Sequence, residues 1–235
     1  MARQPAHNIA PGVWRIPIVT DDAINAFAFV GDDGAVTLMD AGLPYAGKRV
    51  DAGLRYLGSD TSEVTRILVT HAHGDHVGGV ARVAKASGAP VMSHPDDANW
   101  IRLGQMPTID ARIRFRPQLR RFGKYPPVEV TETFTDGELL DVAGGIRAIH
   151  TPGHTPGHTS FVHEPTGVLI TGDAVHFWRK KIRIGIKFSC TDIDLNEQSA
   201  QRFAELDYDG VAFTHGPEIR VGGKTAMLKF LAART

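Results

Sequence analysis

Residues 70–79 read THAHGDHVGG and place three histidines and an aspartate within positions 71–76. The run before them, TRILVTH (65–71), has the β-branched and apolar composition of a strand. The run after them, VGGVARVAKASG (77–88), has the spacing of a helix that ends at a glycine. The segment therefore predicts a strand-to-helix turn that carries a cluster of potential metal ligands.

Alternate residues of an extended chain point the same way, so His71 and His73 are expected to face one spot. Gly74 would allow a tight turn, and Asp75 and His76 would then lie where the helix begins. Imidazole and carboxylate together suit zinc or another borderline first-row metal. Four ligands this close exceed what one catalytic ion with an open position uses, which favours two metal ions.

Further ligand candidates follow strands later in the chain. IHTPGHTPGHTS offers His154, LITGDAV offers Asp173 directly after an apolar run, and VAFTHGPE offers His215 in the same strand-end position. The alternative is that these are core or surface residues with ordinary hydrogen bonds. Their common position at strand ends favours one shared metal centre.

Length and composition set broad limits. With 235 residues, 42% hydrophobic and 22% charged, the chain is typical of one globular domain, expected to span 1–235. No apolar run approaches the roughly 18 residues of a membrane span. The single cysteine, Cys190, excludes an intramolecular disulfide, and the opening MARQPAHNIAPGVWRIP has no apolar signal core. A cytoplasmic location is therefore expected.

Short strands alternate with helical patterns along the whole sequence, which favours two mixed sheets packed face to face with helices outside. Strands are expected at 13–18, 25–31, 35–42, 65–71, 90–94, within 137–153, and at 159–165, 167–173 and 210–216; helices are expected at 46–58, 77–88, about 195–206 and 224–232. The proline-containing segment 100–127 fits this alternation poorly and is interpreted as an insertion.

These motifs, with MDAG at Asp40, resemble those of the metallo-β-lactamase-fold superfamily, over nearly the whole chain. The resemblance implies an α/β fold, an αββα four-layer sandwich of two mixed β-sheets flanked by helices, with the site at one edge between the sheets. It implies that His71, His73 and His154 bind one metal ion. Asp75, His76 and His215 would bind the other, and Asp173 would bridge both. Asp40 would lie behind the ligands or simply form a strand-end turn.

Within the superfamily, the sequence is most similar to the glyoxalase II-like and lactonase-like branch. Enzymes that hydrolyse β-lactams generally lack the bridging aspartate, and one subclass uses a cysteine ligand in the interval where Cys190 lies; TGD at Asp173 argues against that role. Glyoxalase II enzymes carry a C-terminal helical domain, whereas 20 residues follow His215 here, so glutathione specificity is not expected. Flavodiiron proteins have glutamate at the position of His73, which argues against electron transfer.

The resemblance implies a hydrolase of carbonyl esters, lactones or thioesters, in which a hydroxide bridging two divalent metal ions attacks the carbonyl. Zinc is the favoured ion, with manganese or iron as alternatives. Asp75 or Asp173 would carry the proton. His176 takes the place of a tyrosine with which lactonases bind the substrate carbonyl, or is a polar wall residue; His158 is interpreted as structural.

Two alternatives belong to other classes. A persulfide-dioxygenase-like enzyme would hold a single iron on His71 or His73, His154 and Asp173. A phosphodiesterase or nuclease would use the basic stretches 101–127 and 179–187 as phosphate clamps, but nothing resembles a dedicated RNA-binding arm.

The expected partner is a small-molecule substrate, an apolar or anionic acyl compound, with no membrane span and no nucleic acid. The insertion is expected to cap the site or to form a dimer contact in a homodimer. Its apolar side would consist of Trp100, Phe115, Leu119 and Phe122.

Overall fold

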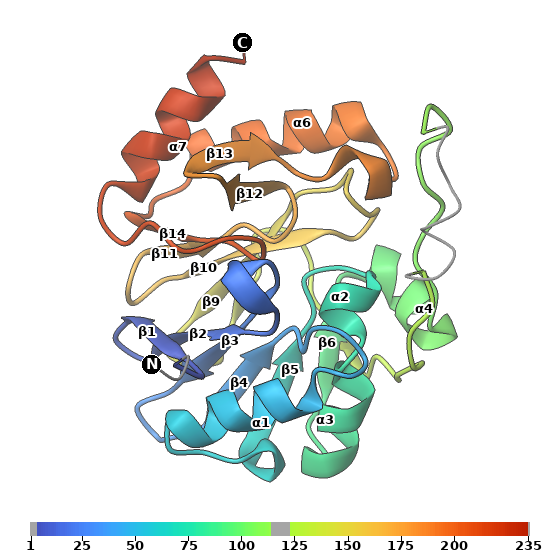
Figure 1. Ribbon diagram of the computed structural model, residues 1–235, viewed down its shortest axis with the longest axis vertical. Coiled ribbons are helices and arrows are strands. Elements are labelled where there is room, and N and C mark those ends of the chain that lie inside the picture. Colours follow the sequence, from blue (N-terminus) through green and yellow to red (C-terminus); the bar gives the residue numbers. More distant parts are fainter. Residues whose placement is uncertain (1–3, 114–122, 235) are drawn as a thin grey trace.

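The computed structural model describes residues 4–113 and 123–234 (Figure 1). Its larger sheet has the strand order β1-β2-β3-β4-β5-β6-β7. The strands are β1 (His7–Ala10), β2 (Val13–Pro17), β3 (Asn25–Val30), β4 (Val36–Met39), β5 (Val64–Leu68), β6 (Val91–Ser93) and β7 (Glu132–Thr133). Pairing is antiparallel from β1 to β4 and parallel from β4 to β7.

The second sheet has the order β14-β11-β10-β9-β8, and a separate hairpin joins β12 to β13. The strands are β8 (Leu139–Leu140), β9 (Ile146–His150), β10 (Thr159–His163), β11 (Val168–Ile170), β12 (Val175–Trp178), β13 (Lys181–Ile184) and β14 (Gly210–Ala212). Only the pair β11 and β14 of this sheet is parallel. Both sheets are therefore mixed, as predicted.

Helices cover the outer face of each sheet. Figure 1 shows α1 and α3 on the outer side of the larger sheet and α6 and α7 on the outer side of the second. The helices are α1 (Gly47–Tyr56), α2 (Gly74–Val77), α3 (Val80–Ser87), α4 (Pro95–Leu103), α6 (Ile193–Gln201) and α7 (Gly223–Ala232), with 3-10 turns at Thr20–Asp22, Thr61–Glu63, Lys187–Ser189 and Arg202–Ala204. None of the helices in the described ranges is both long and apolar enough to cross a bilayer.

Three apolar layers hold these elements together. In β3, Ala26 and Ala28 pack in the layer under α1, while Phe27 and Phe29 pack in the layer between the sheets. This alternation is the two-residue period of a strand buried on both faces. A third layer lies beneath α6 and α7 and includes Phe203. The predicted αββα four-layer sandwich is confirmed.

Most predicted elements agree with the structure, including the helix end at Gly88, which has the left-handed φ of 73°. Five elements, β1, β7, α4 and the two strands of the β12–β13 hairpin, were not predicted. Gly74, which was expected to allow a tight turn, is the first residue of α2 and does not have a positive φ. The hairpin was missed because its polar, basic composition masks its alternation.

The segment 100–127 begins inside α4, where Trp100 packs against the core beneath the larger sheet. Its role as an insertion stays a proposal. Phe115, Leu119 and Phe122, which were expected to form its apolar side, lie outside the described residues.

Candidate metal centre

The seven candidate ligands come from four loops at one edge of the sandwich. The loop after β5 leads into α2, which lies where the two sheets face each other (Figure 1). His154 lies between β9 and β10, Asp173 three residues after the end of β11, and His215 three residues after the end of β14. The topology therefore brings together side chains that are up to 144 positions apart in the sequence.

The first group consists of His71, His73 and His154, all buried. Nε2 of His71 lies 3.1 Å from Nδ1 of His73, which lies 3.0 Å from Nε2 of His154. Nitrogens bound tetrahedrally to one zinc at about 2.0–2.1 Å lie roughly 3.3 Å from one another. The spacing of this group thus fits a single metal ion.

The second group consists of Asp75, His76 and His215. Oδ2 of Asp75 lies 3.7 Å from Nε2 of His76 and 3.6 Å from Nε2 of His215. Nε2 of His76 is buried and has no hydrogen-bond partner among the described residues. A buried nitrogen of this kind is costly unless it binds something, and a metal ion would satisfy it.

Asp173 lies between the two groups. Its Oδ2 is 3.2 Å from Nε2 of His154 and 3.1 Å from Nε2 of His215, and its Oδ1 is 3.5 Å from Nε2 of His76. One carboxylate thus touches the first group through His154 and the second through His76 and His215, which is the arrangement that a bridging ligand requires.

The hydrogen-bond network leaves bare nitrogens facing the centre. In four of the histidines the outer ring nitrogen, Nδ1, has its own acceptor, which assigns the proton of the neutral ring to Nδ1 and leaves the Nε2 lone pair for a metal ion. These contacts are His71 to Thr70 Oγ1, His76 to Asp40, His154 to the Cys190 sulfur and His215 to the Ala23 carbonyl. Such a set of aligned lone pairs fits divalent metal ions.

The electrostatics also favour cations at this centre. Burial lowers the pKa of His71 and His73 well below the ordinary value. Burial acts the same way on His76 and His154, but the Asp173 carboxylate, with other acceptors, outweighs it and raises the pKa of His76 to about 9 and of His154 to about 10. The buried carboxylate therefore demands compensating positive charge, which metal ions would supply.

Asp40 supports two of the ligands. Its Oδ2 accepts hydrogen bonds from Nδ1 of His76 at 2.9 Å and from Oγ1 of Thr70 at 2.7 Å. Because that hydroxyl hydrogen goes to Asp40, Thr70 accepts from Nδ1 of His71 at 3.0 Å. Asp40 also has a left-handed φ of 59° at the end of β4. The two roles considered for Asp40, support behind the ligands and strand-end turn, are thus combined.

His158 has a structural position. Its Nε2 accepts the backbone N–H of Asp173 at 2.8 Å, and its Nδ1 faces the Thr151 hydroxyl at 2.8 Å. Burial lowers the pKa of His158 to about 3, which keeps the ring neutral and able to accept. The Cβ of any side chain at Gly172 would lie 2.4 Å from this ring. His158 therefore positions the backbone of Asp173.

Cys190 and His176 lie outside both ligand groups in the described part of the chain. The Cys190 sulfur is 3.4 Å from Nδ1 of His154, on the side away from the centre. His176 is on β12, and its Nδ1 is buried without a partner among the described residues.

A further group of potential ligands, His94, Asp96 and His150, lies apart from the seven candidates and has a different geometry. The two imidazole rings are stacked, with centroids 3.9 Å apart and planes within 10° of parallel. Lone pairs lie in the ring planes, so those of stacked rings run parallel and do not converge on one ion. This group is therefore a weaker metal candidate than the two above.

Sequence reasoning missed Asp97, the buried carboxylate that connects two ligand loops. Its Oδ2 accepts from the backbone N–H of Ala72 at 2.8 Å and the Thr155 hydroxyl at 2.6 Å, and its Oδ1 accepts from the backbone N–H of Gly157 at 2.7 Å. It holds the loop of His71 and His73 against the loop of His154. Its place in the first turn of α4 gave no signal in the sequence, because α4 itself was not predicted.

We expect Asp97→Ala to lower the free energy of unfolding by about 3–5 kcal/mol, because it leaves three buried donors without an acceptor. The neighbouring Asp96, whose side chain is 56% exposed, provides the control. Asp96→Ala should cost at most about 1 kcal/mol through the helix dipole. Urea unfolding of both variants measures the difference, and equal losses would show that Asp97 does not connect the loops.

Comparisons with known proteins concern the family and the fold of the chain. The family model described as metallo-beta-lactamase superfamily matches residues 19–215. A metallo-β-lactamase from Cronobacter sakazakii with substitutions in its HARLDQ motif superposes with a TM-score of 0.73 and 22% identity, covering 97% of this chain and 94% of that one. At that identity the likeness shows the fold alone.

Two curated relatives match over shorter parts of their length. The uncharacterized protein YobT of Bacillus subtilis is 36% identical over 150 residues, which are 62% of this chain and 59% of YobT. A hydroxyacylglutathione hydrolase of Rhodopseudomonas palustris is 31% identical over 171 residues, which are 71% of this chain and 53% of that enzyme. The matches therefore span little more than half of each relative.

Proposed function

The chain belongs to the metallo-β-lactamase superfamily, and from that premise we propose that it hydrolyses carbonyl esters, lactones or thioesters, with two divalent metal ions, preferably zinc. The observation that carries the proposal is the position of Asp173, with Oδ2 3.2 Å from His154 in one ligand group and 3.1 Å from His215 in the other.

In this proposal His71, His73 and His154 would hold one ion, and Asp75, His76 and His215 would hold the other. Asp173 would be a ligand of both. Divalent cations bound there would supply a nucleophilic water of lowered pKa and positive charge opposite the carbonyl oxygen. The protein's own contribution is the fixed orientation of the ligands, which Asp40, Asp97 and His158 maintain.

The two aspartates that could transfer a proton to or from the substrate, Asp75 and Asp173, differ in solvent exposure. The Asp75 side chain is 33% exposed, whereas that of Asp173 is 4% exposed. Asp173 also accepts a hydrogen bond from the Thr214 hydroxyl at 2.7 Å, so both its oxygens are engaged. We therefore assign proton transfer to and from the substrate to Asp75. His176, with its unpartnered Nδ1, would donate to the substrate carbonyl.

Two parts of the segment 100–127, residues 100–113 and 123–127 at its two flanks, support its proposed role as a cap. The Tyr125 hydroxyl lies 3.3 Å from the carbonyl of Ala72, within the ligand loop. The backbone N–H of Asp110 donates to the carbonyl of Cys190 at 2.8 Å, and the Cys190 sulfur lies beside His154. Both flanks are thus attached to loops that carry or contact ligands, which favours a cap over a dimer contact.

A panel of substrates tests the reaction class. The zinc- and manganese-loaded protein is expected to hydrolyse acyl thioesters or lactones and to turn over penicillins, cephalosporins and phosphodiesters weakly or not at all. The hydroxyacylglutathione hydrolase relative, whose name denotes a thioester substrate, supports this order. Preferred turnover of a phosphodiester or a β-lactam would contradict it, and one iron per chain with oxygen uptake would favour the dioxygenase alternative.

A further inference from the structure

The β12–β13 hairpin begins two residues after Asp173 and has two unlike faces. Val175 and Ile184 are buried in the apolar layer beneath α7, and Phe177 and Ile182 pack against that layer. Because side chains alternate along a strand, the remaining residues of both strands share the opposite face. These residues are His176, Trp178, Lys181 and Arg183.

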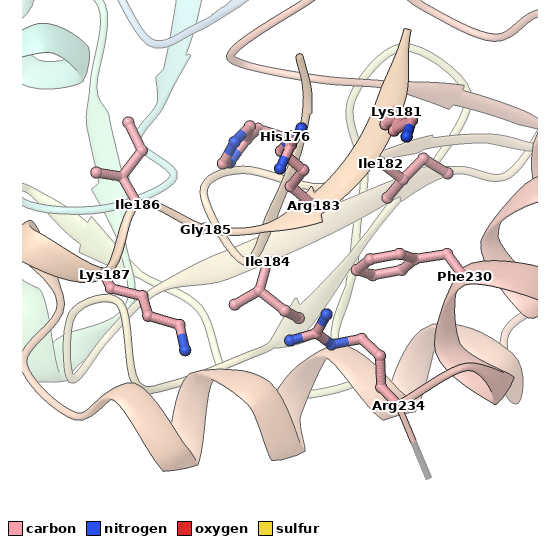
Figure 2. A pocket seen from close by; sticks show the side chains of 10 residues that line it. All are labelled: His176, Lys181, Ile182, Arg183, Ile184, Gly185, Ile186, Lys187, Phe230 and Arg234. Carbon is pink, nitrogen blue, oxygen red and sulfur yellow. The ribbon is translucent and has the colours of Figure 1, made fainter. Parts of the chain in front are cut away.

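The strand register places these side chains in two cross-strand pairs. His176 lies opposite Arg183, and Trp178 lies opposite Lys181. Directly opposite residues of an antiparallel pair have Cβ atoms about 4.5–5.5 Å apart. Figure 2 shows the Arg183 guanidinium beside the His176 imidazole. The face therefore presents an imidazole and a guanidinium at one end, and an indole and an ammonium at the other.

The end with His176 is the one nearest the candidate metal centre. Burial lowers the pKa of His176, the charge of Asp173 opposes that lowering, and the charges of His215 and Arg183 add to it. The backbone N–H of the next residue, Phe177, donates to the carbonyl of His215 at 2.9 Å, so this end of the hairpin adjoins a loop that carries a candidate ligand. A molecule whose carbonyl lies at the centre would therefore have this face beside it.

A cavity of about 410 Å³ opens along the edge of β13 (Figure 2). Four of its lining residues are cationic, Lys181, Arg183, Lys187 and Arg234, and none of its described lining residues is acidic. Arg234 is paired with Glu197 at 2.5 Å. Within residues 4–113 and 123–234 no carboxylate forms an ion pair with Lys181, Arg183 or Lys187, so their charge is available to a ligand.

We propose that Arg183 and Lys181 bind an anionic group, a carboxylate or a phosphate, of the substrate whose carbonyl is hydrolysed at the metal centre. A guanidinium presents paired donors that match either oxyanion. Two residues of strand span about 7 Å, so the anionic group lies a short chain away from the carbonyl, with Trp178, 45% exposed, along its apolar part. This inference rests on the proposed hydrolysis and names its substrate class.

Two pairs of thioesters test the anionic site, and in each pair one member has the anionic group and the other is neutral. One is S-butanoyl-3-mercaptopropionate with its primary amide, which has no second ester bond, and the other is S-butanoyl-4′-phosphopantetheine with S-butanoyl-pantetheine. The metal-loaded protein is expected to favour the charged member of at least one pair by about 10-fold in kcat/KM. The pair that shows the preference distinguishes a carboxylate from a phosphate.

Arg183→Gln is expected to reduce the ratio of kcat/KM for the charged thioester to kcat/KM for its neutral partner to near one. Lys180→Gln is the matched control, because it removes the same charge from an exposed residue at the tip of the hairpin that does not line the cavity. It should retain the ratio. An equal loss of the charged-to-neutral kcat/KM ratio in both variants would indicate that the overall positive charge of residues 179–187, and not a contact with Arg183, attracts the anion. That result would overturn the assignment to Arg183.

The corresponding S-butyl thioethers cannot be hydrolysed and separate this inference from the proposed reaction. Titration calorimetry should give about 10-fold tighter binding of a charged thioether than of its neutral partner, and Arg183→Gln should abolish the difference. If binding shows this pattern while no ester is hydrolysed, the anionic site stands and the proposed reaction is wrong. If esters are hydrolysed but neither turnover nor binding depends on charge, the reaction stands and the anionic site is overturned.

Discussion

Asp173→Ala is expected to lower kcat/KM for the best lactone or thioester by about 10⁴-fold or more. The Asp173 carboxylate is buried and lies within 3.5 Å of three imidazoles that belong to both ligand groups. Its removal takes away the negative charge that offsets two cations and separates the groups from each other. The variant should therefore also retain less than one metal ion per chain.

Asp32→Ala, a change of the same residue type in an exposed turn, is the control for this variant. It should retain both activity and metal. Far-ultraviolet circular dichroism should show that Asp173→Ala keeps the fold, since the contacts of its backbone N–H with His158 do not depend on the side chain. Activity within about 10-fold of the unmodified protein would exclude Asp173 as a ligand.

Asp75→Ala is expected to have the next largest effect, a decrease in kcat/KM of about 10²–10³-fold. Asp75 belongs only to the second ligand group, and its side chain is 33% exposed. Its loss should weaken that group while His71, His73 and His154 keep their spacing. The metal content should fall from two ions to one, in contrast to the deeper loss with Asp173→Ala.

His215→Ala provides an independent check, because it removes another member of the same group. Both variants should give the same metal content. The variant with both substitutions should lose no more activity than either single variant, since each substitution empties the same site. Two tightly held ions in Asp75→Ala would show that Asp75 is not a ligand and would transfer its proposed proton transfer role to another group.

The ligand set could be predicted from the sequence because its signals are local. Four members lie within six residues at a strand-to-helix turn, and His154, Asp173 and His215 each follow a recognisable strand. Side chains that follow strand ends at the same edge of a sandwich lie close together. The position of each residue just after a predicted strand was therefore sufficient to predict that these side chains meet. The family resemblance then supplied the proposed division into two groups. The ligand atoms of His71, His76 and Asp173 also lie within 4.8 Å of one another, so the two groups adjoin.

The supporting residues could not be predicted because their contacts are not local. Asp97 accepts hydrogen bonds from residues 25, 58 and 60 positions away, and no pattern in the sequence encodes such partners. Asp40 was considered for support, but its bond to His76 spans 36 positions. The hairpin that carries Arg183 was missed for another reason, since the basic residues around its turn obscure the alternation along its strands.

Metal stoichiometry tests the central claim, a dinuclear centre, most directly. The protein is stripped with a chelator, loaded with excess zinc, freed of unbound metal by gel filtration and measured by inductively coupled plasma mass spectrometry against amino-acid analysis; a second sample is loaded with manganese. The two ligand groups joined by Asp173 predict two ions per chain. A content that never exceeds one ion per chain with either metal would contradict the account.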